Sequence, residues 1–477
     1  MKRIFSTIVF ASLALSTFAG GLLTNTNQSA SFVRNPMRYA SLETDAIYFN
    51  PAGTAFFNEG WALSANWQMI WQDRDVTSLL DKKTYKGEVY VPCMPTIMAA
   101  YKTGDWTFSG FFGIPGGGGK CEFNNGLPYF NALGNGFKDL LPVMSGAQAT
   151  SDAYSQFQST QYMFSLQLGA AYKINENLSA YAGIRGNYTS ASYEGGIYMD
   201  GMSANGAIKA SPLSLELKQT GIAFAPIIGI DYKVGDFNFA AKYEFRAVTN
   251  VENSTDMLGI FGENYNKGVA EAGKAIVGKV YGAVYQQAMA NGADAATAEA
   301  MANAKVSEVQ KGAGGKLGLL SSLEDGKTLR SDAPALLSLA GSWQATSWFK
   351  AMVGATCYFD KDAKVESLLG AADNNKNLDR NTYELLAGVE FNVTKNLLLS
   401  AGIQYSDFGI TDEYTSDLGF INDSFTTGLG AKYSFNENWD LNVGFCYANY
   451  AHDTNKLKGS SYMRKTYNVA VGVDFRF

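Results

Sequence analysis

Hydrophobic and polar residues alternate along the last stretch of the chain, TYNVAVGVDFRF, from Thr466 to Phe477. From Tyr467 onward every second residue is bulky and apolar, and the residues between them are polar or small. Successive side chains of a β-strand point to opposite faces, so the pattern predicts a strand with one apolar face. A soluble sandwich with that face turned inward fits the pattern, and so does a transmembrane barrel with that face turned toward lipid.

The same alternation recurs along most of the chain, as pairs of runs joined by short polar turns. Each run has about ten residues, the length of a tilted strand that crosses a bilayer. Short turns with Asn, Asp or Gly between such runs indicate β-hairpins. The hairpin segments are TIMAAYKTGDWTFSGFFGIP, FSLQLGAAYKINENLSAYAGIRGNY, IIGIDYKVGDFNFAAKYEFR, LSLAGSWQATSWFKAMVGATCYF, YELLAGVEFNVTKNLLLSAGIQY and FTTGLGAKYSFNENWDLNVGFCY.

Charged residues on the polar faces favour the barrel. In the run 237–246, one face is rich in phenylalanine and tyrosine, and the other carries Lys242, Glu244 and Arg246. Burying these charges in an apolar core would cost several kcal/mol each, whereas a wet barrel lumen would solvate them or supply partners.

Aromatic residues flank nearly every short turn. Amphipathic rings at one depth on many strands form a girdle at a membrane interface. A soluble sandwich gives no reason for such a girdle, so the pattern also favours the barrel. The flanking residues are Tyr101, Trp106, Tyr172, Tyr232, Phe237, Trp343, Phe349, Phe391, Phe435 and Trp439.

The predicted fold class is therefore all-β, a transmembrane antiparallel β-barrel of about 14 strands over residues 61–477. Six hairpins, one strand near Trp61 to Arg74 and the closing strand Lys465 to Phe477 make up this number. Short turns would then face the periplasm and longer connections the outside, including residues 75–91 and 190–213.

The longest connection, residues 249–334, is rich in alanine and does not alternate. Tyr281, Tyr285 and Met289 repeat at a spacing of four residues, which predicts an amphipathic helix pair in this extracellular loop. Either the pair caps the outer mouth by packing on its neighbours, or it offers a surface groove for a greasy ligand.

The N-terminus reads as an export signal. Lys2 and Arg3 precede a short apolar run, and small residues lie near Ala19, so residues 1–19 are predicted to be a cleaved signal peptide. The apolar run is shorter than the roughly 20 residues that a spanning helix needs. The mature protein is expected in the bacterial outer membrane.

Composition and charge narrow the possible partners. Mean hydropathy is −0.11 and the isoelectric point is about 5.1, and the net charge of −6 argues against a nucleic-acid partner. The four cysteines are too few for a disulfide scaffold. Cys93 and Cys121 could meet near one rim, or they could stay unpaired as small apolar residues.

Signals of catalysis are poor. The one histidine, His452, falls in the last predicted outer loop, without the serine arrangement of a membrane hydrolase. No Cys/His cluster suggests zinc. The run Gly116 to Lys120 departs from a phosphate-binding loop because Cys121 follows the lysine. We expect no enzyme activity, no cofactor and no metal.

Residues 20–60 precede the first strand and do not alternate, and a barrel this wide needs a plug, or hatch. Within them DAIYFNPAG resembles the hatch signature of the FadL/TodX-type outer-membrane transporters of long-chain fatty acids and other hydrophobic compounds. Asn50, Pro51, Ala52 and Gly53 match this signature position by position.

A second stretch, FSGFFGIPGGGGKCEF, resembles the part of these transporters in which a strand breaks at a proline and a glycine. The resemblance implies a kinked strand at Pro115 and Gly116 that opens a gap in the barrel wall. Proline supplies no donor to the strand ladder and glycine holds a strand weakly, which agrees with that reading.

Strand parity places a set of apolar residues in the lumen. They could line a pocket for a lipid-like tail or simply pack against the hatch, and the sequence leaves both readings open. Arg185, Lys242 and Arg246 also point inward by parity. They could pair with a ligand carboxylate or form a charge network with Glu244, Glu384 and Glu390. The apolar residues are Met98, Phe111, Met163, Ile227, Met352, Leu386 and Leu398.

The resemblance implies a monomeric transporter that imports long-chain fatty acids or other hydrophobic small molecules by passive diffusion, with lateral release into outer-membrane lipid. It also implies that the C-terminal Phe477 is read by the barrel assembly machinery. The alternative is an adhesion or structural barrel that works through its extracellular loops.

Overall fold

The computed structural model describes residues 27–136, 138, 147–258, 278, 281–317, 323–366, 377–417 and 419–477. The predicted signal peptide and the first residues of the predicted hatch lie outside the described residues.

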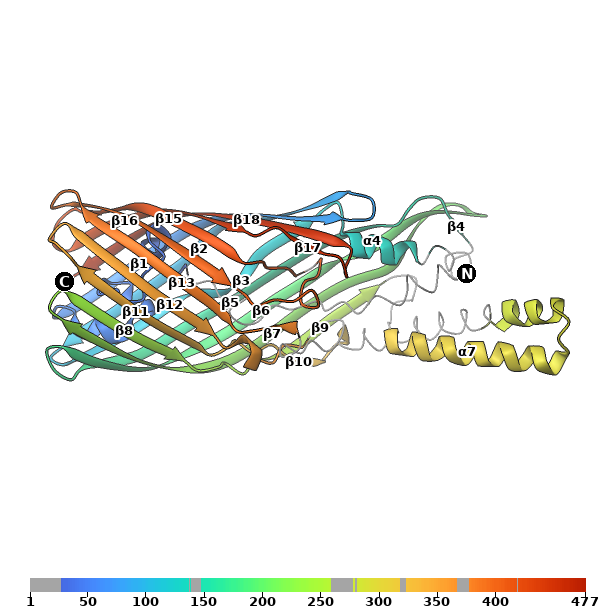
Figure 1. The fold of residues 1–477 in the computed structure, drawn as a ribbon, viewed down its shortest axis with the longest axis horizontal. Helices are drawn as coiled ribbons and strands as arrows, with labels where there is room; N and C mark the ends of the chain where they lie inside the picture. Colours follow the sequence, from blue (N-terminus) through green and yellow to red (C-terminus); the bar gives the residue numbers. More distant parts are fainter. Residues whose placement is uncertain are drawn as a thin grey trace.

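A closed barrel of 14 antiparallel strands forms the molecule, as the sequence predicts (Figure 1). β18 returns to pair with β1 from Ala62↔Arg476 to Ser78↔Ser460, so the barrel has no open edge. The barrel strands are β1 (Gly60–Ser78), β2 (Thr84–Thr103), β3 (Trp106–Phe123), β5 (Tyr154–Lys173), β6 (Leu178–Ser203), β7 (Gly206–Val234), β8 (Phe237–Glu244), β11 (Leu336–Gln344), β12 (Phe349–Tyr358), β13 (Thr382–Asn392), β14 (Leu397–Asp407), β15 (Ser424–Ser434), β16 (Trp439–Tyr450) and β18 (Ser460–Arg476).

Additional strands and helices lie at the outer end of this barrel and inside it. The short strands are β4 (Gln148–Ala149), β9 (Asn250–Leu258), β10 (Thr328–Arg330) and β17 (Asp453–Asn455). The helices are α2 (Ala30–Arg34), α3 (Ala46–Phe49), η1 (Pro51–Phe56), α4 (Pro128–Asn135), α7 (Ala295–Leu317) and η3 (Asp360–Asp362).

Several strands are much longer than a bilayer requires. β6 has 26 residues and β7 has 29, whereas about ten suffice to cross. The predicted outer loops at 75–91 and 190–213 are therefore wrong: most of their residues extend β1, β2, β6 and β7 beyond the membrane. The apolar alternation ends where the strands leave lipid, but backbone pairing continues because the neighbouring strand is still present.

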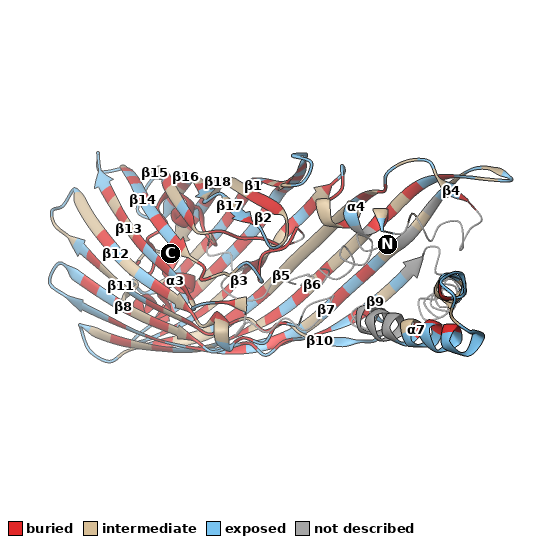
Figure 2. Cartoon of the chain, turned by 45° about the vertical axis from the view of Figure 1, so that its right-hand side comes forward, coloured by how far each residue is buried: buried red, intermediate tan, exposed pale blue. Residues whose placement is uncertain are grey.

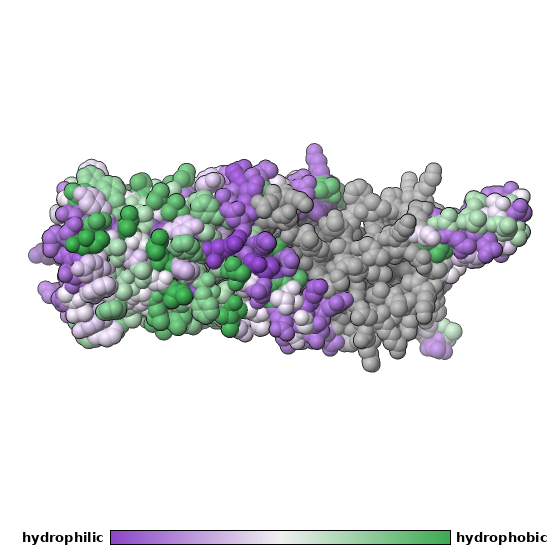
Figure 3. All heavy atoms as spheres, turned by 90° about the horizontal axis from the view of Figure 1, so that it is seen from below, coloured by the Kyte–Doolittle hydropathy of each residue, from purple (hydrophilic) through white to green (hydrophobic). Residues whose placement is uncertain are grey.

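The outer face of the barrel carries an apolar band. Buried and exposed residues alternate along the strands (Figure 2), and on the face that Figure 3 shows, hydrophobic residues cover much of the part of the barrel near the short turns. On β1, Trp61, Trp67 and Trp71 are exposed on this band. Ring contacts continue the girdle from strand to strand, with 4.9 Å between the centroids of Trp61 and Tyr101.

The long extracellular connection is helical where it is described. Residues 281–290 are helical, and α7 follows a turn in which Asp294 Oδ1 accepts a hydrogen bond from Thr297 N at 2.7 Å. α7 extends away from the barrel (Figure 1). The described helices therefore do not lie across the outer mouth, which was one of the two alternatives that the sequence offered. Within the described ranges, no helix combines the length and apolarity that a membrane crossing requires.

Candidate functional site

The N-terminal segment fills the barrel at the end that carries the short turns. We call residues 27–59 the plug segment. Its residues 28–41 and 44–55 are all buried. The side chain of Ser29 caps α2 by accepting a hydrogen bond from Phe32 N at 2.9 Å. α2 packs on β15, β16 and β18, and η1 packs on β5, β6 and β7, so the segment bridges opposite walls.

The Asn-Pro-Ala-Gly motif forms a tight turn in which Asn50, Pro51 and Gly53 each have a distinct structural role. Asn50 Oδ1 accepts from Gly53 N at 3.4 Å, and Asn50 Nδ2 donates to the carbonyl of Ser41 at 3.1 Å and to Asp231 of the wall. Pro51 begins η1, where its fixed φ suits a helix start. A Cβ on Gly53 would lie 2.5 Å from Asn50 Nδ2, so glycine is required there.

The wall also binds the backbone of this motif. Ser179 Oγ donates to the carbonyl of Ala52 at 2.7 Å, and Thr107 Oγ1 donates to that of Thr54 at 3.1 Å. Ala52 packs against Tyr181 and Ile227 of the wall. The motif therefore anchors one side of the plug segment to β3, β6 and β7.

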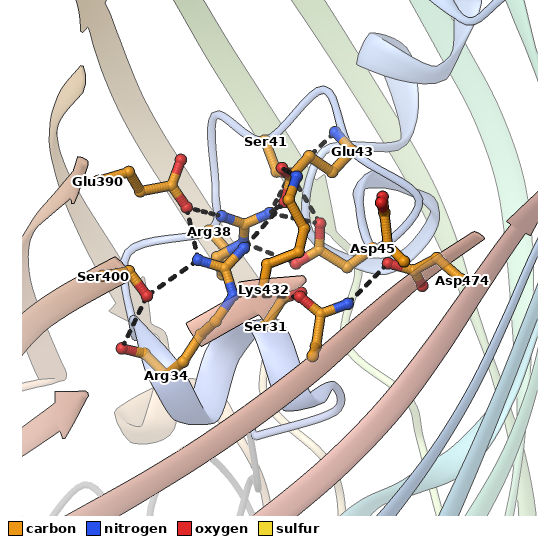
Figure 4. A network of polar contacts seen from close by, with 12 residues as sticks. Ser31, Arg34, Arg38, Ser41, Glu43, Asp45, Glu390, Ser400, Lys432 and Asp474 are labelled. Carbon is orange, nitrogen blue, oxygen red and sulfur yellow. Dashed lines mark hydrogen bonds and ion pairs between the residues drawn. The ribbon is translucent and has the colours of Figure 1, made fainter. Parts of the chain in front are cut away.

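A buried ion cluster anchors the other side (Figure 4). Arg34 Nη1 lies 2.8 Å from Glu390 Oε1, and Arg38 Nη1 lies 2.9 Å from the same oxygen. Arg38 Nε lies 2.7 Å from Asp45 Oδ2, and both arginines also pair with Glu43. Both arginine side chains are almost fully buried, so their charges are stabilised by the neighbouring carboxylates rather than by water.

Glu43 joins the ion cluster to a second wall strand, because Lys432 of β15 pairs with it, whereas Glu390 lies on β13. Burial alone would raise the pKa of Glu43. Lys432, Arg38 and Arg34 together outweigh burial and hold that pKa well below its usual range.

Glycines in register on neighbouring strands make room for this side of the plug segment. Gly388 pairs with Gly402, Gly402 with Gly428, and Gly430 with Gly444. A Cβ on Gly444 would lie 2.5 Å from Arg34 N, and one on Gly402 would lie 2.4 Å from an Asn35 oxygen. These wall positions need glycine because backbone and side-chain atoms of the plug segment approach them closely.

The predicted lumen residues do face inward, but most of them touch the plug segment. Ile227 packs on Ala52 and Ala55, Leu398 is buried on β14, and Met163 lies beside Gly116. The rest share a cluster with plug aromatics such as Tyr48 and Phe49. These are Met98, Phe111, Met352 and Leu386.

The three predicted lumen cations differ in their surroundings. Arg185 pairs with Glu244 and lies over the Tyr48 ring at 4.8 Å. Lys242 donates to the carbonyl of Tyr48 at 3.0 Å and lies 3.8 Å from Glu244. Arg246 does not face the lumen as parity predicted. It lies beyond the end of β8, where the alternation has stopped, and its exposed side chain is 3.9 Å from Asp332.

The other two predicted network acids have partners of their own. Glu384 accepts hydrogen bonds from Tyr358 at 3.2 Å and Gln404 at 2.8 Å. Glu390 belongs to the ion cluster around Arg34 and Arg38. The expected single charge network is therefore divided into separate groups.

The wall is irregular at β3. The β2–β3 ladder breaks between the pairs Val89↔Cys121 and Ile97↔Phe112. Residues 113–120, which include Pro115 and Gly116, fall in this break, and the β3–β5 register shifts twice over the same stretch. Gly117 and Gly119 have positive φ angles of 104° and 69°, which glycine adopts readily. We call this break the wall gap.

A small cavity of about 40 Å³ lies beside the wall gap. It is lined by Pro115, Met163, Arg185, Asn187 and Tyr358, among others. A larger hollow of about 650 Å³ lies on the other side of the plug segment, at the short turns near Phe57, Lys102 and Lys233. The plug segment thus separates the two spaces.

Sequence reasoning missed the ion cluster. The signal was present in SASFVRNPMRYAS, where Arg34 and Arg38 lie four residues apart in an otherwise mostly apolar and small stretch. Two arginines in such a stretch need buried partners. The partners Glu390 and Lys432 are far away in sequence, and only the closed barrel brings them to the arginines.

The residues considered for chemistry lie apart. His452 is exposed between β16 and β17. The four cysteines are free, with Cys93 exposed and Cys121 buried, so the two do not pair. In the described ranges no group of three or more His, Cys, Asp or Glu residues is arranged to hold a metal ion.

Comparisons with known proteins agree with this architecture. Residues 293–477 match the model of the outer membrane protein beta-barrel domain. A Pseudomonas aeruginosa FadL homologue of known structure is 15% identical, with a TM-score of 0.60, over 98% of this chain and 100% of that one. No curated protein matches the chain in sequence.

Two further solved structures have the same fold. The Pseudomonas putida toluene transporter TodX is 13% identical, with a TM-score of 0.56, over 98% of this chain and 100% of that one. The CymD monoaromatic hydrocarbon channel is 12% identical, with a TM-score of 0.51, over 96% of this chain and 99% of that one. At sequence identities this low, the structural likeness shows the fold alone.

Proposed function

We propose that this outer-membrane β-barrel carries hydrophobic small molecules across the outer leaflet. The premise is its fold, which it shares with the FadL homologue and the hydrocarbon channels. The proposed cargo is long-chain fatty acids or other hydrophobic small molecules. The molecule enters the outer half of the lumen, and the plug segment acts as a hatch that blocks the axial route. It leaves through the wall gap into the membrane.

The observation that carries this proposal is that the plug segment closes the lumen while the barrel wall is interrupted at the wall gap. The plug segment is held by ion pairs, hydrogen bonds and close backbone packing on several strands. The wall gap is the longest break in a barrel ladder within the described residues, because residues 90–96 of β2 and 113–120 of β3 have no partner in each other's strand. A hydrophobic molecule meets less resistance at this gap than through the charged plug.

We propose that the chain acts as a monomer without catalysis, and that Phe477 engages the assembly machinery. Phe477 closes the barrel by exchanging backbone hydrogen bonds with Trp61 at 2.7 and 3.0 Å, and its exposed ring remains available for recognition.

The test is uptake of a labelled fatty acid into lipid vesicles that contain the purified protein. In Gly118→Phe a bulky side chain would enter the wall gap, where a Cβ meets only Arg74 Nη2 at 3.4 Å. We expect uptake to fall by roughly tenfold or more, because the lateral exit is filled. Gly282→Phe, on an open helical position, is the matched control and should leave uptake unchanged.

Unchanged uptake in Gly118→Phe would refute lateral release. Absence of uptake by the unmodified protein, together with loss of surface binding when residues 281–317 are removed, would favour the adhesion alternative.

A further inference from the structure

Two lumen-facing arginines stand directly opposite each other in the barrel wall. Arg74 of β1 and Arg464 of β18 are cross-strand partners. Their strands carry the lipid-facing pair Trp71↔Tyr467 three residues closer to the membrane centre, so the arginines lie at the height of the outer interface. Like charges placed directly opposite destabilise a strand pair unless something compensates them.

Arg464 has little compensation within the protein. Its guanidinium lies over the ring of Tyr450, 4.5 Å from the centroid. Among the described residues, Arg464 Nε is buried without a hydrogen-bond partner, and no carboxylate forms an ion pair with this side chain. A buried donor without an acceptor is costly, and a guanidinium is the group best suited to bind a carboxylate or phosphate.

The pair borders the wall gap. Arg74 is buried, and its Nη2 lies 3.4 Å from the position that a Cβ on Gly118 would take. Gly118 belongs to the unpaired stretch of β3. A group held by the two arginines would therefore stand at the outer edge of the gap.

The pair lies within an extended apolar cluster of the lumen, which continues beyond the arginines to Val76 and Tyr462 on the outer side. Toward the membrane centre it runs from Val89 and Cys121, next to the arginines, through Val91, Met94 and Ile114 at the gap, all of which are buried. Tyr162 and Phe164 of β5 pack against it and are only partly buried. A hydrocarbon tail would lie against these two partly buried rings and the apolar cluster behind them, with the arginines at one end of that tail.

The cations predicted from the sequence are less suited to this task. Arg185 and Lys242 both already face Glu244, at the plug segment, and Arg246 faces Asp332 outside the lumen. A ligand anion would have to displace an existing carboxylate there, whereas Arg464 has an open donor.

We propose that Arg74 and Arg464 hold the anionic head group of an amphiphilic cargo while its tail lies on the apolar cluster beside the wall gap. This inference rests on the proposed function and narrows its cargo to long-chain carboxylates, rather than uncharged hydrocarbons. The head would then lie at the interface height and the tail toward the membrane centre, the orientation that an outer-leaflet amphiphile adopts.

The experiment compares palmitate with methyl palmitate, which has the same tail without the charge. Binding of each to the purified protein in non-ionic detergent is measured for the unmodified chain, Arg464→Gln and Arg464→Lys. Lys465→Gln serves as the matched control, because it removes a neighbouring charge from the opposite face of the same strand.

For the unmodified protein we expect palmitate to bind on the order of tenfold more tightly than its ester. Arg464→Gln should remove that preference while leaving ester binding unchanged, and ester binding also shows that the variant is folded. Arg464→Lys should keep part of the preference, and Lys465→Gln all of it.

Equal binding of palmitate and ester by the unmodified protein, or a preference that survives in Arg464→Gln, would overturn the inference while leaving hydrophobic transport intact. Binding of neither compound would instead count against the proposed function itself.

Discussion

At the scale of single residues, the plug segment is held by charges that cannot reach water. Arg34, Arg38 and Lys432 face Glu43, Asp45 and Glu390. Such a cluster is costly to bury, and it becomes far more costly when one member is lost, because the others remain buried without compensation.

Removing Arg38 should therefore release the plug segment. In Arg38→Met, three carboxylates lose a shared cation, at a cost of roughly 3–5 kcal/mol. We expect ion conductance across a planar bilayer to rise above the closed level of the unmodified protein. Arg380→Met, which breaks a largely exposed pair with Asp407 away from the plug segment and the wall gap, should conduct no more than the unmodified protein. Equal conductance of the two variants would contradict a locking role for the cluster.

The same cluster predicts a dependence on pH. Because the pKa of Glu43 is lowered by its cationic neighbours, its contribution to plug stability is full above the unfolded pKa of about 4.3 and is lost as the pH falls through the folded value. We expect amide protection of residues 30–45, corrected for intrinsic exchange, to decrease between pH 7 and pH 3. In Glu43→Gln the amides of residues 30–45 should be less protected at pH 7 than in the unmodified protein. Their protection should also change less between pH 7 and pH 3. Constant protection in the unmodified protein would argue against this account.

At the scale of elements, the glycines of β13 to β16 explain how a plug fits so closely against a wall. The register aligns them across strands, and at each of them plug atoms, from side chains or backbone, occupy the space that a wall side chain would fill. The same residue type has a different role in β3, where Gly117 and Gly119 permit backbone angles that break the ladder.

A side chain at the docking face should displace α2. In Gly444→Val the new Cβ would lie 2.5 Å from Arg34 N and 2.9 Å from the Ala30 carbonyl oxygen, and backbone cannot move aside cheaply. We expect proteases to cut the plug segment faster, while the barrel still migrates as a folded species in heat-modifiability gels. Gly282→Val, in open space, should be cut like the unmodified protein.

At the scale of the whole molecule, closure depends on the last residues meeting the first strand. β18 pairs with β1 over its full length, and Phe477 stacks on Phe475 with 4.9 Å between the ring centroids. Deleting Phe477 removes two backbone hydrogen bonds to Trp61 and the exposed terminal ring.

We expect a chain without Phe477 to accumulate in the periplasm rather than in the outer membrane, as measured by fractionation. Phe477→Tyr keeps an aromatic terminus and should be inserted normally. Normal insertion of the truncated chain would exclude the terminal residue as an insertion signal.

The alternation of side chains by itself determined the class of fold, the strand number and the inward direction of most predicted lumen residues, because a period of two follows from strand geometry alone. The alternation gave wrong predictions where the strand geometry changes. Arg246 does not face the lumen because it lies past the end of a strand. The predicted outer loops are partly strand, because the long outer hairpins lose their apolar face but keep their backbone pairing. Only the tertiary structure decided what the inward residues touch. The ion cluster, the glycine docking face and the Arg74–Arg464 pair each join residues hundreds of positions apart, which meet because the barrel closes around its own N-terminus.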